Sequence, residues 1–198
     1  MKRTLGLTLL LFATLFSCMR QEKPLPAELS RAESVMWEHP DSALSILRSM
    51  PQSSLSSGKN YATWALLLAQ ARDKVYGKRL PDSLNIPSSD KLVQDAMDYF
   101  EKEGNLKRMA QTYYYKGQLL KDQKKITEAM PFFLKSKEMM TKLDEPLFTY
   151  LICQSLGNTY RYQDLYEESL VQLKDAYQYA LRSGNGERIS YALSELGR

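Results

Sequence analysis

The sequence has 198 residues, of which 43% are hydrophobic and 25% are charged, as in an ordinary globular protein rather than a disordered one. Its formal net charge of +4 falls to +2 without Lys2 and Arg3, which lie in a segment that we expect to be removed. Such a weak charge does not favour a nucleic acid as the partner of this region.

The N-terminus has the pattern of an export signal. Lys2 and Arg3 precede a mainly apolar run of 12 residues from Leu5 to Phe16. A helix that crosses a bilayer needs about 20 apolar residues, so this shorter run predicts a signal peptide rather than a membrane span. We find no later stretch of the sequence with the character of a transmembrane helix.

The apolar run ends in "LFSC", residues 15–18, which resembles the lipobox of bacterial lipoproteins. The resemblance implies cleavage before Cys18 and attachment of a palmitate-type lipid to its thiol, which makes residues 1–17 a lipoprotein signal peptide. A plain secretory signal with a chance cysteine is the alternative. Met19 in place of an aspartate, and the lack of an acidic run after Cys18, imply an outer-membrane protein that faces the periplasm.

Residues 18–28 contain the polar, proline-containing stretch "MRQEKPLPAE" and are expected to form a flexible tether. Beyond the tether, the apolar spacing predicts a series of helices. A long connection at residues 77–89 interrupts the series and is either a functional loop or a plain surface insertion. The expected helices are Ala27–Glu38, Asp41–Met50, Lys59–Tyr76, Asp90–Glu103, Leu106–Asp122, Ile126–Lys142, Glu145–Gln163, Tyr166–Ser183 and Glu187–Arg198.

Residue types at the helix ends support these bounds. Ser89, Asn105 and Asp144 are expected as N-caps, because their short polar side chains accept hydrogen bonds from the free N–H groups of a first turn. Gly104 and Gly184 are expected as C-terminal stops, because glycine readily adopts the left-handed backbone that ends a helix.

An internal repeat is visible in the glycines. Gly117 recurs as Gly157 and again as Gly197, at two equal intervals of about 40 residues, a length typical of helical repeats. Ala129 and Ser169 follow the first two glycines at the same distance, and each is followed four places later by a large apolar residue. That spacing puts the small and the large residue on one face of a helix. The equal intervals indicate a repeated helix pair rather than tolerated surface glycines.

This pattern resembles the tetratricopeptide repeat, a pair of antiparallel helices A and B. The resemblance covers residues 29–198 and implies an all-α fold, a right-handed superhelix of antiparallel helix pairs, with a period of about 40 residues instead of about 34. HEAT-like repeats share the longer period and are the alternative fold. The matching residues are Tyr113, Gly117, Ala129 and Phe133 in one copy, and Leu156, Gly157, Tyr160 and Ala176 in the next.

The resemblance also accounts for the glycines, each of which costs about 1 kcal/mol inside a helix relative to alanine. Helices A and B of this family cross closely, and a side chain at Gly117, Gly157 or Gly197 would hold them apart. Ala129 and Ser169 are expected to be the small partners on helix B. Because no helix B follows Gly197, we expect the repeat domain to be incomplete at its C-terminal end and the chain to be part of a longer protein.

The sequence offers little for catalysis. Its one histidine, His39, lies beside Pro40 and is expected at a helix junction. We find no phosphate-binding GxxxxGK motif, no dinucleotide-binding glycine pattern and no HExxH motif. Cys153 is expected to be a small buried residue without a disulfide partner, since Cys18 carries the lipid. We therefore predict no enzymatic activity, no cofactor and no metal site.

The resemblance further implies where a partner binds, because helix A of each repeat lines the concave face of the superhelix. Most of the side chains carried onto that face are amides, tyrosines and cations, which can pair with a peptide backbone or hold a carboxylate. A soluble groove without a ligand is the alternative. The residues expected to line this groove are Gln111, Tyr114, Gln118, Lys121, Asp122, Leu151, Gln154, Asn158, Arg161 and Tyr162.

Three stretches, "HPDSALSIL", "ARDKVYGK" and "AQTYYYKGQLLKD", resemble the repeat lipoproteins of Bacteroidota. We therefore predict a membrane-anchored scaffold lipoprotein that holds a protein or peptide partner in the periplasm. Many chains of this type continue into a membrane span and a signalling or DNA-binding region, so the first alternative is the sensor region of a longer regulator. The second alternative is a glycan-binding lipoprotein of the starch-utilisation type.

Overall fold

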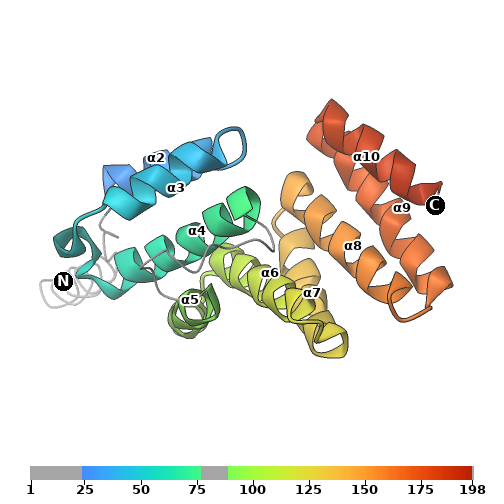
Figure 1. The fold of residues 1–198 in the computed structure, drawn as a ribbon, viewed down its shortest axis with the longest axis horizontal. Coiled ribbons are helices and arrows are strands. Elements are labelled where there is room, and N and C mark those ends of the chain that lie inside the picture. The colour runs from blue at the N-terminus through green and yellow to red at the C-terminus, as the bar shows by residue number, and fades with distance from the viewer. Residues whose placement is uncertain (1–23, 77–88, 198) are drawn as a thin grey trace, which may run out of the picture.

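The computed structural model describes residues 24–76 and 89–197. All regular secondary structure in these two ranges is helical and neither range contains a strand, which confirms the predicted all-α class (Figure 1). No helix within them combines the length and the hydrophobicity that crossing a bilayer requires. The predicted signal peptide, Cys18, the first part of the tether and the connection at 77–88 lie outside the described residues.

The helices begin and end close to their expected bounds, and the bounds of α6 and α9 match the prediction at both ends. The largest departure is α2, which ends at Val35 because residues 36–38 form a turn toward Pro40. The 3-10 helix η1 is an addition to the expected elements. The observed bounds are α2 (Ala27–Val35), α3 (Pro40–Ser49), η1 (Gln52–Leu55), α4 (Gly58–Tyr76), α5 (Ser89–Glu103), α6 (Leu106–Asp122), α7 (Ile126–Thr141), α8 (Pro146–Arg161), α9 (Tyr166–Ser183) and α10 (Gly186–Leu196).

A residue with a left-handed backbone recurs at equal intervals from the end of α5 to the start of α10. These residues are Gly104, Lys124, Asp144, Asp164 and Gly184, with φ between 53° and 75°. Each of them follows the end of a helix, where the left-handed conformation turns the chain back and lets the last carbonyls accept hydrogen bonds. The interval between these residues is half of that between Gly117 and Gly157. Each helix together with its turn therefore forms a unit, and two such units make up one repeat.

The turn after α6 shows how this conformation ends a helix. The backbone N–H of Lys124 donates to the Lys121 carbonyl, and that of Lys125 donates to the Leu120 carbonyl, both at 2.9 Å. These are the two bonds of a Schellman motif. The turn after α8 repeats both bonds, so the chain leaves α6 and α8 in the same direction.

The predicted caps are correct in part. Asn105 caps α6, and its side-chain oxygen accepts from the backbone N–H of Arg108 at 3.0 Å. Asp144 was expected to cap α8, but it is the left-handed residue, and Glu145 precedes the helix without a side-chain capping bond. Ser89 is the first residue of α5 rather than a residue before it.

Gly117 on α6 and Gly157 on α8 face the following helix at distances that leave no room for a side chain. A Cβ atom on Gly117 would lie 2.7 Å from the ring of Phe133 on α7. A Cβ atom on Gly157 would lie 2.7 Å from the Leu173 side chain on α9. The glycines therefore let α6 approach α7, and α8 approach α9, with large apolar residues seated against the glycine backbone.

The expected small partners contribute to these crossings in another way. Ala129 is fully buried, but the atoms nearest to Gly117 are those of the Phe133 ring. The Ser169 hydroxyl donates to the Gly157 carbonyl at 2.8 Å, which links α9 to α8. Gly197 was expected to pack like the other two glycines, but among the described residues a Cβ atom there would meet only the Ser194 carbonyl of the preceding turn, at 3.8 Å.

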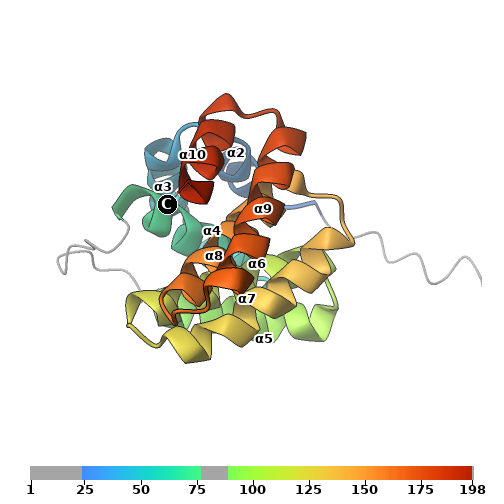
Figure 2. The same cartoon turned by 90° about the vertical axis from the view of Figure 1, so that its right-hand side faces the viewer.

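Most of the packing joins helices that are neighbours in sequence. In Figure 1, α4, α6 and α8 follow one another along the molecule, with α2 and α3 at one end and α9 and α10 at the other. The view from the side shows α2, α3 and α10 above α4 and α6, and α5 on the opposite side (Figure 2). One hydrophobic core runs from α2 to α8, and a smaller cluster joins α8, α9 and α10. The first and last described helices thus lie on the same side of α4 and α6.

Candidate binding site

On α6, three of the predicted groove residues, Tyr114, Gln118 and Lys121, form a hydrogen-bonded row. The Gln118 amide donates to the Tyr114 hydroxyl at 2.8 Å, and the Lys121 ammonium donates to the Gln118 amide oxygen. Gln111 accepts from the guanidinium of Arg108 at 3.1 Å. Gln111 and Tyr114 are buried, while Gln118 and Lys121 are half-buried. The second half of the row is the part that a partner can reach.

On α8, two predicted groove residues are engaged in a contact with α10. The Arg161 guanidinium donates to the Asn158 side-chain oxygen at 2.6 Å and to the Glu195 carboxylate at 2.9 Å. Glu195 is only 2% exposed, so this ion pair ties α10 to α8. Tyr162 is 72% exposed in the turn after α8. Asn158 and Arg161 therefore hold the helices together, which differs from the free groups expected in a groove.

The remaining predicted residues occupy two environments. Leu151 is half-buried and packs against both hydrophobic clusters. Asp122 is half-buried at the end of α6 and acts on Asp73 of α4, whose pKa is raised by burial and then by the Asp122 charge. Lys121 and Lys74 oppose this shift. Charged groups at the ends of α4 and α6 therefore influence the pKa of Asp73.

A cluster that the sequence analysis did not identify lies beside Gln154. The Arg188 guanidinium is 5.3 Å from the centre of the Trp37 ring and 5.7 Å from the centre of the Tyr150 ring. The Lys74 ammonium is 3.6 Å from the centre of the same Trp37 ring. Both cations therefore lie within the range at which an aromatic ring attracts positive charge. The cluster joins the turn after α2 to α4, α8 and α10.

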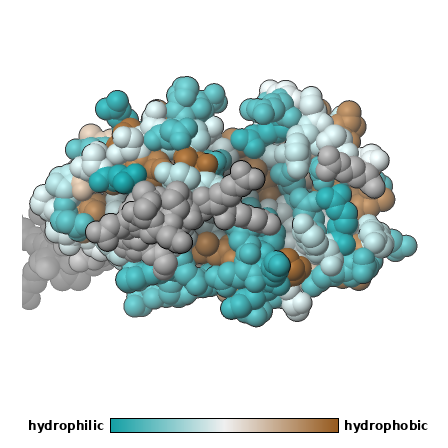
Figure 3. Space-filling view, in the orientation of Figure 1, coloured by the Kyte–Doolittle hydropathy of each residue, from teal (hydrophilic) through white to brown (hydrophobic). Residues whose placement is uncertain are grey.

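A hollow of about 340 Å³ opens next to this cluster, between α8 and α10. It is lined by Tyr150, Gln154, Glu187, Arg188 and Tyr191. Hydrophilic and hydrophobic residues are interspersed over the same end of the molecule in the space-filling view (Figure 3). The hollow is thus a mixed surface that combines aromatic rings, an amide and charged groups. We call the following residues the Trp37 site: Trp37, Lys74, Tyr150, Gln154, Arg188 and Tyr191.

The positive charge of Arg188 acts on Lys74, the other cation of the Trp37 site. The pKa of Lys74 is lowered from 10.5 to about 8, first by burial and then by the positive charge of Arg188. In the described part of the chain, neither side chain forms an ion pair, and the Nε atom of Arg188 is buried without a hydrogen-bond partner. Burial raises the pKa of Tyr150, and Arg188 works against that shift. The site therefore holds two positive charges without a neutralising carboxylate bond.

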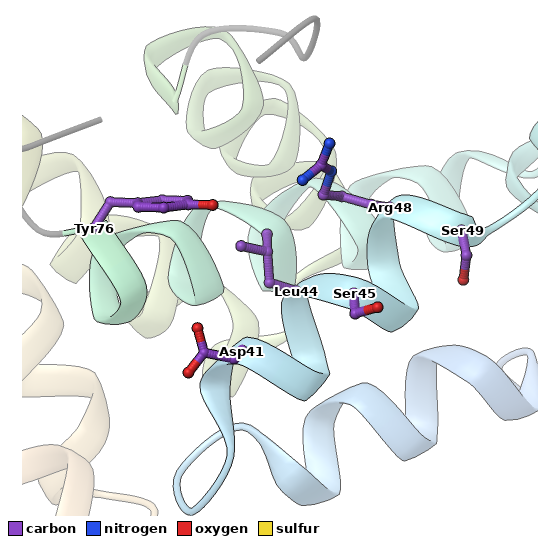
Figure 4. Close-up of a pocket in the computed structure, with 6 residues that line it drawn as sticks. All are labelled: Asp41, Leu44, Ser45, Arg48, Ser49 and Tyr76. Carbon is purple, nitrogen blue, oxygen red and sulfur yellow. The ribbon is translucent and has the colours of Figure 1, made fainter. Parts of the chain in front are cut away.

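A second hollow, of about 460 Å³, lies between α3 and the end of α4. Figure 4 shows the Tyr76 ring reaching toward Leu44, with the carboxylate of Asp41 on the same side and Ser49 pointing away. Arg48 completes its charged lining. No residue predicted to bind a partner lines this hollow.

The residues considered for catalysis or metal binding, His39 and Cys153, are close in sequence to the Trp37 site but are not members of it. His39 is exposed and precedes Pro40 at the start of α3. Cys153 is fully buried between α8 and α9, and burial raises the pKa of its thiol to about 12, so the thiol stays protonated and unreactive at neutral pH. Within residues 24–76 and 89–197, no group of three or more histidine, cysteine or acidic side chains is placed to hold a metal ion.

Comparison with known proteins gives no independent assignment. No protein-family model matches the chain, and no curated protein matches it at a significant level. The function must therefore be argued from the geometry of the described residues.

Proposed function

We propose that this chain is a tetratricopeptide-like α-solenoid, a right-handed superhelix of antiparallel helix pairs, of the kind found in the repeat lipoproteins of Bacteroidota. The evenly spaced left-handed residues and the close crossings at Gly117 and Gly157 support this proposal. Turns and crossings repeated at equal intervals stack helix pairs in a constant direction, which is how a solenoid is built.

The function that the geometry supports best is the binding of a protein or peptide partner, with the chain acting as a scaffold. The observation that carries this proposal is the hollow of about 340 Å³ beside Gln154 and Arg188. On α6, Gln118 and Lys121 are half-buried, so a partner can also reach these two predicted groove residues. Amides and cations of this kind can pair with the carbonyl and N–H groups of an extended peptide. The sensor and glycan-binding alternatives draw no separate support from the described residues.

Affinity capture with the full chain, solubilised from membranes in detergent, tests the binding function. Gln118→Ala combined with Gln154→Ala should reduce recovery of a co-purifying partner, because both half-buried amides belong to the groove that we propose as the binding surface. Gln178→Ala is the matched control, since Gln178 is exposed on α9, away from the hollow. Equal recovery with the double variant and with the control, at unchanged helical circular dichroism, would contradict the proposal.

The lipid anchor belongs to the same proposal and rests on residues 15–18. We propose that Cys18 carries the lipid and that the domain faces the periplasm from the outer membrane. Metabolic labelling with a palmitate analogue should label the full chain and should not label a Cys18→Ala variant. Label that persists in the variant would refute the anchor without affecting the binding proposal.

A further inference from the structure

Two arginines occupy equivalent places along the chain. The stretches "GNLKR", residues 104–108, and "GNGER", residues 184–188, are separated by twice the interval between Gly117 and Gly157. In both, a left-handed glycine ends one helix, and an asparagine caps the next by accepting from the arginine backbone N–H at 3.0 Å. Arg108 and Arg188 therefore occupy the same position in the first turn of α6 and of α10.

Arg108 binds a carboxylate of the same chain at this position. Its guanidinium donates to both oxygens of the Glu33 carboxylate on α2, at 2.9 and 2.7 Å. A guanidinium matches a carboxylate in this two-bonded geometry, which makes such pairs stronger and more specific than single hydrogen bonds. Trp37, the residue that Arg188 faces, comes four residues after Glu33. One arginine position is therefore filled by an internal carboxylate, and the other faces a ring and a hollow.

None of the acidic groups near Arg188 and Lys74 in the described structure binds Arg188 in the way that Glu33 binds Arg108. Glu195 is held by Arg161, and Glu187 is exposed at the rim of the hollow. Asp73 adjoins Lys74 in sequence, yet in the described structure its carboxylate forms no ion pair with Lys74 and acts on it only at longer range. The titratable and charged groups that surround the two cations are Asp73 on α4, Tyr114, Lys121 and Asp122 on α6, Tyr150 on α8, and Glu187, Tyr191 and Glu195 on α10.

We propose that the Trp37 site binds a side-chain carboxylate of an acidic peptide segment, held by the Arg188 guanidinium and the Lys74 ammonium. The inference rests on the proposed peptide-binding function and specifies the chemistry of the partner. The carboxylate takes the place at Arg188 that Glu33 takes at Arg108, and it relieves the repulsion between the two cations. Gln154 and Tyr191, which line the adjoining hollow, contact the neighbouring peptide groups.

The test is a fluorescence titration of the full chain in detergent with a synthetic hexaglutamate peptide blocked at both ends. The chain carries Trp64→Phe, so that Trp37, the other of its two tryptophans, reports on the site. Saturable change of the Trp37 emission is expected with hexaglutamate and not with blocked hexaglutamine. Arg188→Gln and Lys74→Gln should each weaken the hexaglutamate response at least tenfold, whereas Arg188→Lys, which keeps the charge, should retain part of it.

Arg182→Gln is the matched control, because Arg182 lies on α9 and pairs with Asp144 outside the site. It should leave the titration unchanged. Equal responses to hexaglutamate and hexaglutamine, or equal loss in Arg182→Gln and Arg188→Gln, would overturn the inference. So would a response to inorganic phosphate as strong as that to hexaglutamate, which would indicate a general anion site. An unblocked hexaglutamine that matches hexaglutamate would assign the site to a chain terminus and overturn the choice of an acidic segment.

A second readout keeps the test independent of folding defects. If Arg188 lowers the pKa of Lys74, the pKa of Lys74 should rise in Arg188→Gln, as measured by nuclear magnetic resonance of the lysine side chain. An unchanged Lys74 pKa would refute the geometry on which the inference rests. Normal partner recovery by Arg188→Gln, with loss of recovery in the Gln118→Ala and Gln154→Ala double variant, would reject the carboxylate site and retain the binding function.

Discussion

Gly117→Ala is the sharpest test of the close helix crossings. In an unobstructed helix this change would stabilise the protein by about 1 kcal/mol, because alanine loses less conformational entropy on folding. Here the new Cβ would lie 2.7, 2.8 and 3.0 Å from three ring carbons of Phe133, whereas carbon atoms prefer separations of about 3.5–4.0 Å. Phe133 is fully buried, and its ring packs 5.9 Å from that of Tyr114, so it has little room to move. Overpacking of this kind costs about 1–3 kcal/mol, which predicts a net loss of about 1 kcal/mol.

Thermal unfolding followed by circular dichroism measures the effect. Gly186→Ala is the matched control, because Gly186 begins α10 and a Cβ there would meet nothing within 4 Å. The control should be neutral or stabilising by up to about 1 kcal/mol. In a Phe133→Leu background, the smaller side chain should make room for the methyl group and reduce the cost of Gly117→Ala by about 1 kcal/mol. A Gly117→Ala variant as stable as Gly186→Ala would refute the crossing argument.

Three further predictions follow from the described residues. Lys124→Gly should raise the melting temperature, with a gain of about 0.5–1 kcal/mol, and Gly184→Ala should lower it by about 1 kcal/mol, because both positions are left-handed. Glu195→Gln should destabilise by about 1–3 kcal/mol in urea unfolding, since it removes one partner of a pair in which Glu195 is 2% exposed and Arg161 is partly exposed. The pKa of Lys74 is about 8 in the folded state, against 10.5 for an ordinary lysine, which stands for the unfolded state. Between these two pH values the unfolded state therefore binds more protons than the folded state. The free energy of unfolding should rise with pH in this window, by up to about 1.4 kcal/mol per pH unit from this group. A Lys74→Met variant should lose that part of the rise when unfolding is measured across the same pH window.

The helices could be predicted because their signals are local. Apolar spacing and turn residues determine α6 and α9, and their bounds match at both ends. The turn residues were harder to assign, since one residue type serves two geometries. Asp144 is a good N-cap by composition, but aspartate also tolerates the left-handed backbone, and the recurring turn requires that conformation at position 144.

The sequence could predict which residues line the groove, but not which of their side chains form contacts within the protein. The resemblance to the tetratricopeptide repeat implied that Gln118, Asn158 and Arg161 lie on the concave face, but it contained no information on which of them pair within the protein. Arg161 is engaged by Glu195, a residue of a different helix 34 positions away. Lys74 and Arg188 meet at Trp37 only because α4 and α10 are brought together by the whole succession of helices between them. Contacts between residues so far apart in the chain produce no periodic pattern in a single sequence, so they could not be predicted.

The repeated framework explains how one position can serve both the structure and a ligand. Arg108 and Arg188 each lie in the first turn of a helix that is capped by an asparagine. They differ in the group that faces them: Arg108 contacts the Glu33 carboxylate on α2, and Arg188 faces the Trp37 ring in the turn after α2. The first pair fixes α6 against α2, whereas the second brings α10 near α2 without neutralising its charge. A carboxylate that binds Arg188 and Lys74 together would contact α10 and α4 at the same time. Its binding energy would then favour the arrangement in which α4 and α10 are close, which couples recognition of the partner to the position of α10.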